Sequence, residues 1–303
     1  MFEEAQLYAP VTRTDDGAVT VHLGADHPGA TDPDYRRRRN EIAALALDWQ
    51  PGRPVPTVEY LPAEHEVWAL VSAELHRLHE ELACSEYLQG KERLSLPEDH
   101  IPQLAEVTAL LAPTSGFEYL PAAGLVPLRE FYGSLAAGHF YSTQYMRHHS
   151  VPLYTPEPDV VHEVVGHANC LAHEGLAALY RAAGAAVNRV ETAAALEFVS
   201  KVFWFSLEFG VLREHGQVRT YGAGLLSSFG EIQQIERAIL LPLDIARMGT
   251  QTYDITHYQP VLFCADSFEQ VVDVVGTFFD DVDDATAHQL QADAPSPVVP
   301  SAA

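Results

Sequence analysis

The sequence predicts a mainly α-helical domain with minor β structure. Three observations favour this fold class. Apolar residues recur at three- and four-residue spacing over long stretches, which is typical of amphipathic helices. The composition, 47% hydrophobic and 20% charged, is that of an ordinary globular protein. Neither an internal repeat nor a clean linker divides the 303 residues, a length ample for one substantial core.

The N-terminal third carries the clearest signals for individual elements. The segment from Val19 to Leu23 alternates as a short strand does. Thr31-Asp32-Pro33 then places a capping residue before a proline in the first helical turn, and we expect that helix to reach about Leu47. After a loop rich in proline and glycine, a second helix is expected from Pro62 to Ala83, because its apolar residues follow the helical period.

The rest of the chain is expected to combine helices with a little β structure. A short strand is expected from Phe140 to Tyr145, and a hairpin from Val211 to Tyr221 around Gly216. A tail over residues 287–303, low in aromatic residues, is expected to be disordered. The expected helices are Ile101 to Leu111, Pro127 to Leu135, one that starts near Pro158, His173 to Ala183, Val190 to Phe209, and one around Glu231 to Leu240.

The charge of the chain limits its partners. Forty-two acidic residues against eighteen basic ones give a formal net charge of −24. Such a charge argues against binding to nucleic acid or to an anionic membrane surface. The basic run from Arg36 to Arg39 falls within the first expected helix, and we interpret it as a solvated helical face.

Cysteine usage and the N-terminal sequence favour a cytoplasmic protein. Cys84, Cys170 and Cys264 are widely spaced and form no C-x-x-C pair, so the sequence predicts neither a disulfide framework nor a thiolate zinc site. The first residues lack the basic and apolar regions of a signal peptide. No stretch approaches the roughly 18 uncharged apolar residues that a membrane-spanning helix needs.

The most informative stretch is Thr155-Pro-Glu-Pro-Asp-Val-Val-His-Glu-Val-Val-Gly-His167. His162 and His167 lie in an apolar run, and neutral imidazoles in such a setting bind divalent metals well. The alternative is a pair of buried core histidines with hydrogen-bonded rings. A zincin has its two histidines four residues apart, whereas five residues separate them by about 140° on an ideal helix. The two rings therefore meet at one metal only if the helix is distorted or ends, and Gly166 can permit that.

A carboxylate is the usual third partner of two histidines in a catalytic metal site. Glu208 lies in Phe-Trp-Phe-Ser-Leu-Glu-Phe-Gly, where burial would be costly for it unless it is paired or bound to a cation. The alternative for Glu208 is a buried structural ion pair. Two histidines and one carboxylate describe the facial triad of non-heme Fe(II) oxygenases, and the same donor set also suits zinc. Asp159 lies three residues before His162 and is expected to orient its ring.

Several blocks occur in an order that resembles one known family. They are the histidine motif, the block around Glu208, Tyr221 to Glu231, Gly124 to Phe131 and Ser142 to His148. This series closely resembles the pterin-dependent aromatic amino acid hydroxylases, especially the bacterial phenylalanine hydroxylases, over roughly residues 95–280. The resemblance implies a single catalytic domain of that family's fold, with residues 96–286 as the iron and pterin core and residues 1–95 packed on it.

The resemblance also implies cofactors and site residues. A mononuclear Fe(II) bound by His162, His167 and Glu208 would work with tetrahydrobiopterin and O₂, and Glu163 would lie near the pterin. The residues implied in pterin binding are Gly124, Leu125, Val126, Leu128 and Phe131. Those implied in substrate binding are Arg147 for the carboxylate, Thr155 and Ser227 for the amino-acid backbone, and Pro156, Trp204 and Gly224 for the ring pocket.

The expected activity is hydroxylation of L-phenylalanine to L-tyrosine, that is, a phenylalanine 4-monooxygenase. Hydroxylation of tyrosine, tryptophan or another ring position of phenylalanine stays open, because the sequence does not show where the ring sits over the iron. A zinc hydrolase and a catalytically silent binding protein are rival interpretations. The resemblance includes neither the regulatory domain nor the tetramerising helix of the animal enzymes, so we expect a monomer.

Overall fold

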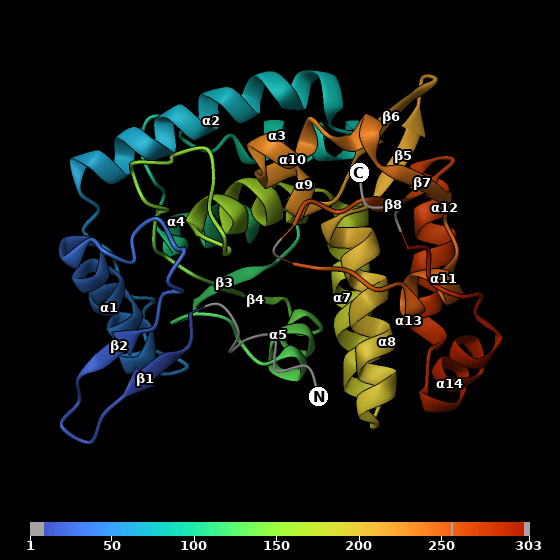
Figure 1. Cartoon of the computed structure of the whole chain (residues 1–303), viewed down its shortest axis with the longest axis horizontal. Coiled ribbons are helices and arrows are strands. Elements are labelled where there is room, and N and C mark those ends of the chain that lie inside the picture. Colours follow the sequence, from blue (N-terminus) through green and yellow to red (C-terminus); the bar gives the residue numbers. More distant parts are fainter. Residues whose placement is uncertain (1–8, 256, 300–303) are drawn as a thin grey trace.

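Helices dominate the structure, and small sheets lie between them (Figure 1). The computed structural model describes residues 9–255 and 257–299. The long helix α2 (Pro62–Leu82) covers one edge of the molecule, while α7 (Glu174–Arg189) and α8 (Ala193–Phe203) pack side by side. The predicted fold class, mainly α with minor β, is confirmed.

Three small sheets complete the architecture. β1 (Val11–Arg13) pairs antiparallel with β2 (Val19–Val21), and β3 (Glu118–Pro121) pairs parallel with β4 (His139–Ser142). A four-stranded sheet has the order β6-β5-β8-β7, in which only the β5–β6 hairpin is antiparallel. Its strands are β5 (Val211–Glu214), β6 (Gln217–Thr220), β7 (Ile239–Pro242) and β8 (Val261–Ala265). The predicted hairpin around Gly216 is therefore confirmed.

The two N-terminal helices form where the sequence predicts them. α1 (Pro33–Asp48) starts after Asp32, whose carboxylate accepts hydrogen bonds from the backbone N–H groups of Asp34 and Tyr35. The shorter helices are α3 (Ser85–Leu94), α4 (Leu104–Leu111), α5 (Leu128–Leu135), α6 (Asn169–Leu171), α9 (Ala223–Ser227), α10 (Phe229–Ile232), α11 (Ile245–Thr250), α12 (Phe268–Val271), α13 (Thr277–Asp281) and α14 (Asp284–Asp293). Three segments are π-helical, namely η2 (His162–Ala168), η3 (Trp204–Glu208) and η5 (Val272–Gly276), and η4 (Ile235–Arg237) is a 3₁₀ helix.

Two predictions near the C-terminus are wrong. The helix expected around Glu231 to Leu240 is replaced by α10, η4 and β7, because Ile239 begins a strand that pairs with Val261 of β8. The tail expected to be disordered from residue 287 is helical as far as Asp293. Asp283 caps α14 by accepting a hydrogen bond from the N–H of Thr286, and α14 packs on α8 and α11. Residues 300–303 lie outside the described residues.

The interpretation of Arg36 to Arg39 as a solvated face is wrong for one of its members. Arg39 is buried, and its guanidinium binds the buried carboxylate of Glu157. Its neighbour Arg37 is exposed and pairs with Asp34 on the surface. Arg39 lies on the side of α1 that faces the rest of the molecule, and Arg38 beside it is half-buried and pairs with Glu64 of α2, so the fully solvated part of the run is Arg36 and Arg37.

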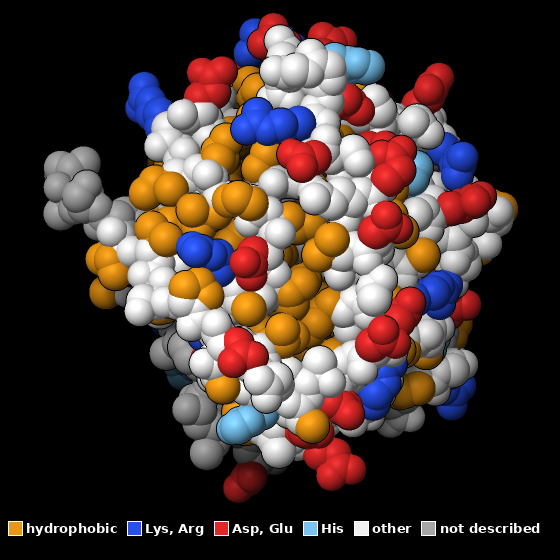
Figure 2. Space-filling view, turned by 90° about the vertical axis from the view of Figure 1, so that its right-hand side faces the viewer, with side chains coloured by type: hydrophobic (Ala, Val, Ile, Leu, Met, Phe, Trp, Pro, Cys, Tyr) orange, Lys and Arg blue, Asp and Glu red, His pale blue; other side chains and the backbone are white. Residues whose placement is uncertain are grey.

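One large apolar cluster forms the core and crosses the expected boundary at residue 95. Trp68 and Leu75 of α2 share it with Val164 of η2 and Phe203 of α8. No helix among the described residues is long and apolar enough to cross a membrane. On the face shown in Figure 2, apolar side chains line a central hollow and extend to its left, while acidic side chains gather mainly on its right.

Candidate functional site

The two histidines of the motif lie on one π-helical turn. η2 spans His162–Ala168, and in a π-helix each turn is closed by a hydrogen bond from residue i to residue i+5. Residues five apart therefore lie above one another, and the Nε2 atoms of His162 and His167 are 3.0 Å apart. The predicted helix distortion is confirmed, and its form explains why the spacing is five rather than four.

Gly166 has a different role from the one its backbone freedom suggested. A Cβ at this position would lie 2.7 Å from the carbonyl oxygen of Ala223 and 3.3 Å from the Cβ of Ser227. Since real Cβ atoms do not approach a backbone atom so closely, α9 can pack against η2 only because residue 166 has no side chain. Gly166 thus serves the packing of α9, which carries Ser227 toward His162.

Glu208 completes the cluster from the second π-helical segment, η3. Its Oε1 lies 3.1 Å from Nε2 of His167, and its Oε2 lies 3.9 Å from Nε2 of His162. Two ligands about 2.1 Å from one metal and at right angles to each other are about 3.0 Å apart. The pairs His162–His167 and His167–Glu208 meet this separation, whereas His162 and Glu208 are farther apart, at 3.9 Å. The structure thus brings together the three residues predicted from the sequence.

A second carboxylate, Glu163, also lies close to both histidines, and it has to be weighed against Glu208. Its Oε1 accepts hydrogen bonds from the backbone N–H and the hydroxyl of Thr143. Burial raises the pKa of Glu163 to about 7, so this carboxyl keeps a proton in acid and partly at neutrality. Burial is also the largest single influence on Glu208, but the attraction and hydrogen bond to His167, the attraction to the other histidine and a hydrogen bond from the backbone of Gly224 together outweigh it and lower the pKa. The ionised Glu208 is the better third ligand.

In each of the two histidines, the ring nitrogen that faces away from the cluster lies within hydrogen-bond distance of a hydroxyl group. Nδ1 of His162 lies 2.9 Å from the hydroxyl of Ser227, which itself donates to the carbonyl of Ala223. Nδ1 of His167 lies 2.9 Å from the hydroxyl of Tyr180. When each Nδ1–H donates to its hydroxyl, each Nε2 keeps its lone pair for the metal. Burial and the neighbouring His167 lower the pKa of His162 to about 4, which favours the neutral ligand form.

Arg147 and Asp159 form a fully buried ion pair beside the cluster. Nε and Nη2 of Arg147 each donate to Asp159 at 2.8 Å, and the backbone N–H of Arg147 donates to the same carboxylate. Asp159 also accepts from the backbone N–H of His162 at 3.3 Å. The expectation that Asp159 orients the ring of His162 is therefore wrong. Asp159 instead links Arg147 to the start of the metal-binding helix, while the hydroxyl of Ser227 orients the ring.

The residues predicted to contact the substrate lie on segments around this cluster. Thr155 and Pro156 are half-buried in the loop before η2, and the hydroxyl of Thr155 donates to the carbonyl of Glu157. Trp204 is half-buried and stacks on Tyr253, with ring centroids 4.4 Å apart. Gly224 has no room for a side chain, because a Cβ there would lie 2.8 Å from the ring of Phe209.

The predicted pterin-binding residues lie in the segment between β3 and α5 and in α5 itself. Leu125 is exposed, whereas Gly124, Val126 and Leu128 are half-buried. Phe131 contacts the ring of Phe140, which in turn lies against the ring of His167, so aromatic contacts connect this segment to the metal cluster. An exposed apolar loop beside such rings fits a flat heterocycle such as a pterin.

Sequence reasoning missed the group that supports the loop before η2. Glu157 is buried with Arg39 of α1 and lies 3.4 Å from Nε2 of His27. The guanidinium of Arg39 also lies over the ring of Tyr145, 3.3 Å from its centroid. A glutamate between two prolines in an apolar motif could have indicated a buried partner, but nothing in the sequence pointed to residues more than 100 positions earlier.

Comparisons with known proteins agree with this geometry. Residues 16–293 match the family described as biopterin-dependent aromatic amino acid hydroxylase. Phenylalanine 3-hydroxylase from Streptomyces coeruleorubidus is 50% identical over 258 residues, which cover 85% of this chain and 92% of that protein. Phenylalanine-4-hydroxylase from Homo sapiens is 39% identical over 267 residues, which cover 85% of this chain and 58% of that protein.

Solved structures of bacterial proteins are also similar. A single-site variant of phenylalanine hydroxylase from Chromobacterium violaceum aligns with a TM-score of 0.75 at 28% identity, covering 87% of this chain and 94% of that one. Another structure of the Chromobacterium violaceum enzyme, with bound iron(III) and 7,8-dihydrobiopterin, aligns with a TM-score of 0.72 at 28% identity, covering 80% and 87% of the two chains.

Proposed function

This chain belongs to the biopterin-dependent aromatic amino acid hydroxylase family, and on that premise we propose that it hydroxylates the ring of free L-phenylalanine. The observation that carries the proposal is the convergence of His162, His167 and Glu208 on one point, next to a buried arginine. A Fe(II) ion would be held by these three side chains. Bound iron and tetrahydropterin would supply the activation of O₂, with one oxygen atom going to the ring and one to the pterin.

The protein's own contribution begins with binding the amino acid. Arg147 offers a planar guanidinium whose Nε and Nη2 are fixed by Asp159. Among the described residues, nothing accepts a hydrogen bond from its Nη1, which leaves that group for the carboxylate of the substrate. Since Arg147 is buried and its geometry is already set, little conformational entropy is lost when the substrate binds.

The side chains around the ring would then fix its position. Trp204, held by its stacking on Tyr253, and Pro156 would form apolar walls, and Gly224 lets the ring of Phe209 pack closely against it. Glu163 retains a proton up to about pH 7 and can donate a hydrogen bond toward the pterin. Ser227 holds His162 in the orientation that binds the metal.

The ring position is the finer part of the proposal. We place carbon 3 first, because the relative with 50% identity over nearly its whole length is a phenylalanine 3-hydroxylase. Carbon 4, the position predicted from the sequence, is the second candidate, and the name of the human relative supports it. The two products differ only in where the phenylalanine ring lies relative to the metal, so small shifts in the ring pocket decide between them.

Product analysis tests both parts of the proposal. The chain would be loaded with Fe(II) without oxygen, then given tetrahydrobiopterin, O₂ and L-phenylalanine, and the products separated against meta-tyrosine and para-tyrosine standards. We expect meta-tyrosine as the main product. Para-tyrosine as the main product would establish carbon 4 instead. Turnover of tyrosine or tryptophan with no product from phenylalanine would overturn the proposed substrate.

A further inference from the structure

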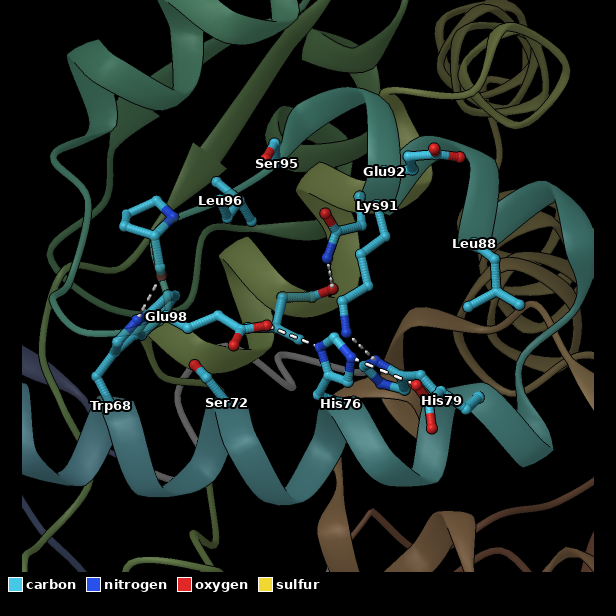
Figure 3. Close-up of a pocket in the computed structure, with 14 residues that line it drawn as sticks. Trp68, Ser72, His76, His79, Leu88, Lys91, Glu92, Ser95, Leu96 and Glu98 are labelled. Atoms are coloured by element: carbon cyan, nitrogen blue, oxygen red, sulfur yellow. Dashed lines mark hydrogen bonds and ion pairs between the residues drawn. The ribbon is translucent and has the colours of Figure 1, made fainter.

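A pocket of about 440 Å³ lies between α2, α3 and the segment that follows α3 (Figure 3). Val165 of η2 and Asn169 of α6 also line it. None of the residues assigned above to metal, pterin or substrate lines this pocket. Its volume is within the range of small-molecule sites, which is roughly 300 to 1,000 Å³. The pocket is therefore large enough for a ligand and separate from the site already described, although it shares helix η2 with that site.

Two buried polar atoms in its lining have no partner among the described residues. They are the hydroxyl oxygen of Ser72 and Oδ1 of Asn169, whose residues are 7% and 2% exposed. Figure 3 shows the Ser72 hydroxyl directed from α2 into the pocket. A buried polar group without a hydrogen bond costs about 1–3 kcal/mol, and such groups are rare in native proteins. These atoms indicate a polar ligand that completes them.

The basic side chains of the pocket already have partners. Nζ of Lys91 lies 3.2 Å from Nδ1 of His79, whose Nε2 lies 2.6 Å from the carbonyl oxygen of Leu226. Burial lowers the pKa of His79 to about 3, so its ring is neutral and Nδ1 accepts from Lys91. His76 lies between the carboxylates of Glu98 at 2.8 Å and Glu80 at 3.6 Å. Lys91 and His76 therefore already have partners within the protein.

The remaining lining favours a cation with an apolar body. The lining carries three carboxylates, those of Glu80, Glu92 and Glu98, which outnumber the ammonium of Lys91 and the imidazole of His76, so its net charge is negative in either form of His76. Asn169 Oδ1 and the glutamate oxygens are acceptors, and a ligand must bring donors to them. Trp68, Leu88, Leu96 and Val165 supply apolar walls beside these acceptors. Acceptors and apolar walls together match an ammonium group carried on a small hydrocarbon body.

We propose that this pocket binds a small arylalkylammonium compound. Its ammonium group meets the acceptors of the lining, and its ring lies against the half-buried side chains of Leu88 and Leu96. The hydroxyl of Ser72 gains a partner from the ligand or from a water molecule that enters with it. The inference does not depend on the proposed substrate or ring position, because it uses no residue of the active site.

Calorimetric titration of the full chain with 2-phenylethylammonium chloride tests the proposal. We expect saturable binding, and we expect 3-phenylpropionate, an anion with a similar body, to bind about tenfold more weakly or worse. Ser72→Leu should weaken 2-phenylethylammonium binding about tenfold by filling the pocket. Glu98→Gln should weaken it about threefold by removing one charge at the mouth. Asp99→Asn, at the neighbouring exposed position outside the lining, is the matched control and should leave binding unchanged.

Three outcomes would overturn the proposal. They are no saturable binding of the amine, equal binding of 3-phenylpropionate, and amine binding that is unchanged in both Ser72→Leu and Glu98→Gln. The last would place the amine elsewhere, for example at the active site. Circular dichroism and hydroxylase activity would show whether Ser72→Leu is folded. If it is not, the comparison of Glu98→Gln with Asp99→Asn decides.

Discussion

At the scale of single residues, ionisation separates two glutamates that are close neighbours in space. Glu208 and Glu163 both lie near the two histidines, and burial raises the pKa of both, but the remaining contacts outweigh burial only at Glu208. Contacts with His167, with the other histidine and with the backbone of Gly224 together keep Glu208 ionised, whereas burial dominates at Glu163 and keeps it partly protonated. The sequence could predict Glu208 because an apolar surround makes an unpaired carboxylate costly. The hydrogen bonds of Glu163 to Thr143 depend on the tertiary fold and could not be predicted.

Replacing each glutamate by glutamine tests this difference. Glu208→Gln should reduce bound iron to about a tenth or less, because a neutral amide is a poor substitute for an ionised ligand. Glu163→Gln should keep most of the iron and instead weaken the apparent affinity for the pterin. Metal analysis of the purified variants and pterin titrations measure both effects. Iron lost from Glu163→Gln and retained by Glu208→Gln would reverse the assignment.

Glu231 provides a separate test of how burial acts on a carboxyl group. Burial raises its pKa from 4.5 to about 7, so the folded state binds more protons than the unfolded state between these values. The contribution of Glu231 to the free energy of unfolding is therefore fully present below about pH 4.5 and is lost as the pH rises through about 7. Glu231→Gln removes that loss and keeps an oxygen for the N–H of Gln259. The variant should be about 3 kcal/mol more stable at pH 8.

Urea unfolding of this variant and the parent chain at pH 5 and pH 8 measures the difference. The exposed neighbour Glu236→Gln is the control and should change little at either pH. A Glu231→Gln variant with the same small effect at both pH values would show that Glu231 is ionised in the folded protein at neutral pH.

At the scale of elements, the π-helix decides where the two imidazoles point. The five-residue spacing was enough to predict a distorted helix, because an ideal α-helix separates the two rings. The sequence did not reveal the cause of the close packing at Gly166, which is the carbonyl of Ala223 from a helix more than 50 residues later. The helix predicted around Glu231 to Leu240 is wrong for the same reason. The pairing of β7 with β8 is a tertiary contact, and it overrides the helical pattern of the local sequence.

A matched pair of glycines tests the role of this contact. Gly166→Ala should cost about 1–3 kcal/mol of folding stability and weaken iron binding, because the new methyl group forces α9 away from η2. Gly276 also lies in a π-helix, but a Cβ there would meet only the end of the Leu179 side chain at 3.3 Å. Gly276→Ala should therefore change stability by less than about 1 kcal/mol. Equal effects of the two substitutions on unfolding and iron content would contradict this account.

At the scale of the whole molecule, the N-terminal part helps to build the site. Arg39 from α1 pairs with Glu157 in the loop that carries Thr155 and Pro156. The family match also begins at residue 16, well before residue 95, where the resemblance of the sequence motifs begins, and the core shared by α2 and η2 joins this part to the active site. A charge run alone does not show which of its members turns inward.

Two of the four arginines of α1 give this idea a direct test. Arg39→Gln should destabilise the protein by about 3 kcal/mol, because it leaves the buried Glu157 without its main partner, and it should raise the KM for phenylalanine. Arg37→Gln removes an exposed pair and should cost less than about 0.5 kcal/mol. Thermal unfolding and steady-state kinetics measure both. If Arg39→Gln matched Arg37→Gln in stability and KM, the ion pair would have no part in holding the loop.

The central claim is that the His162, His167 and Glu208 cluster serves a monooxygenase that acts on an aromatic ring. It is tested most directly by turnover of L-phenylalanine under ¹⁸O₂ with Fe(II) and tetrahydrobiopterin, followed by mass spectrometry of the amino-acid product. We predict a hydroxyphenylalanine that carries one ¹⁸O atom, formed by the parent chain and not by Glu208→Gln. A product whose hydroxyl oxygen came from water, or equal product from the Glu208→Gln variant, would contradict the claim.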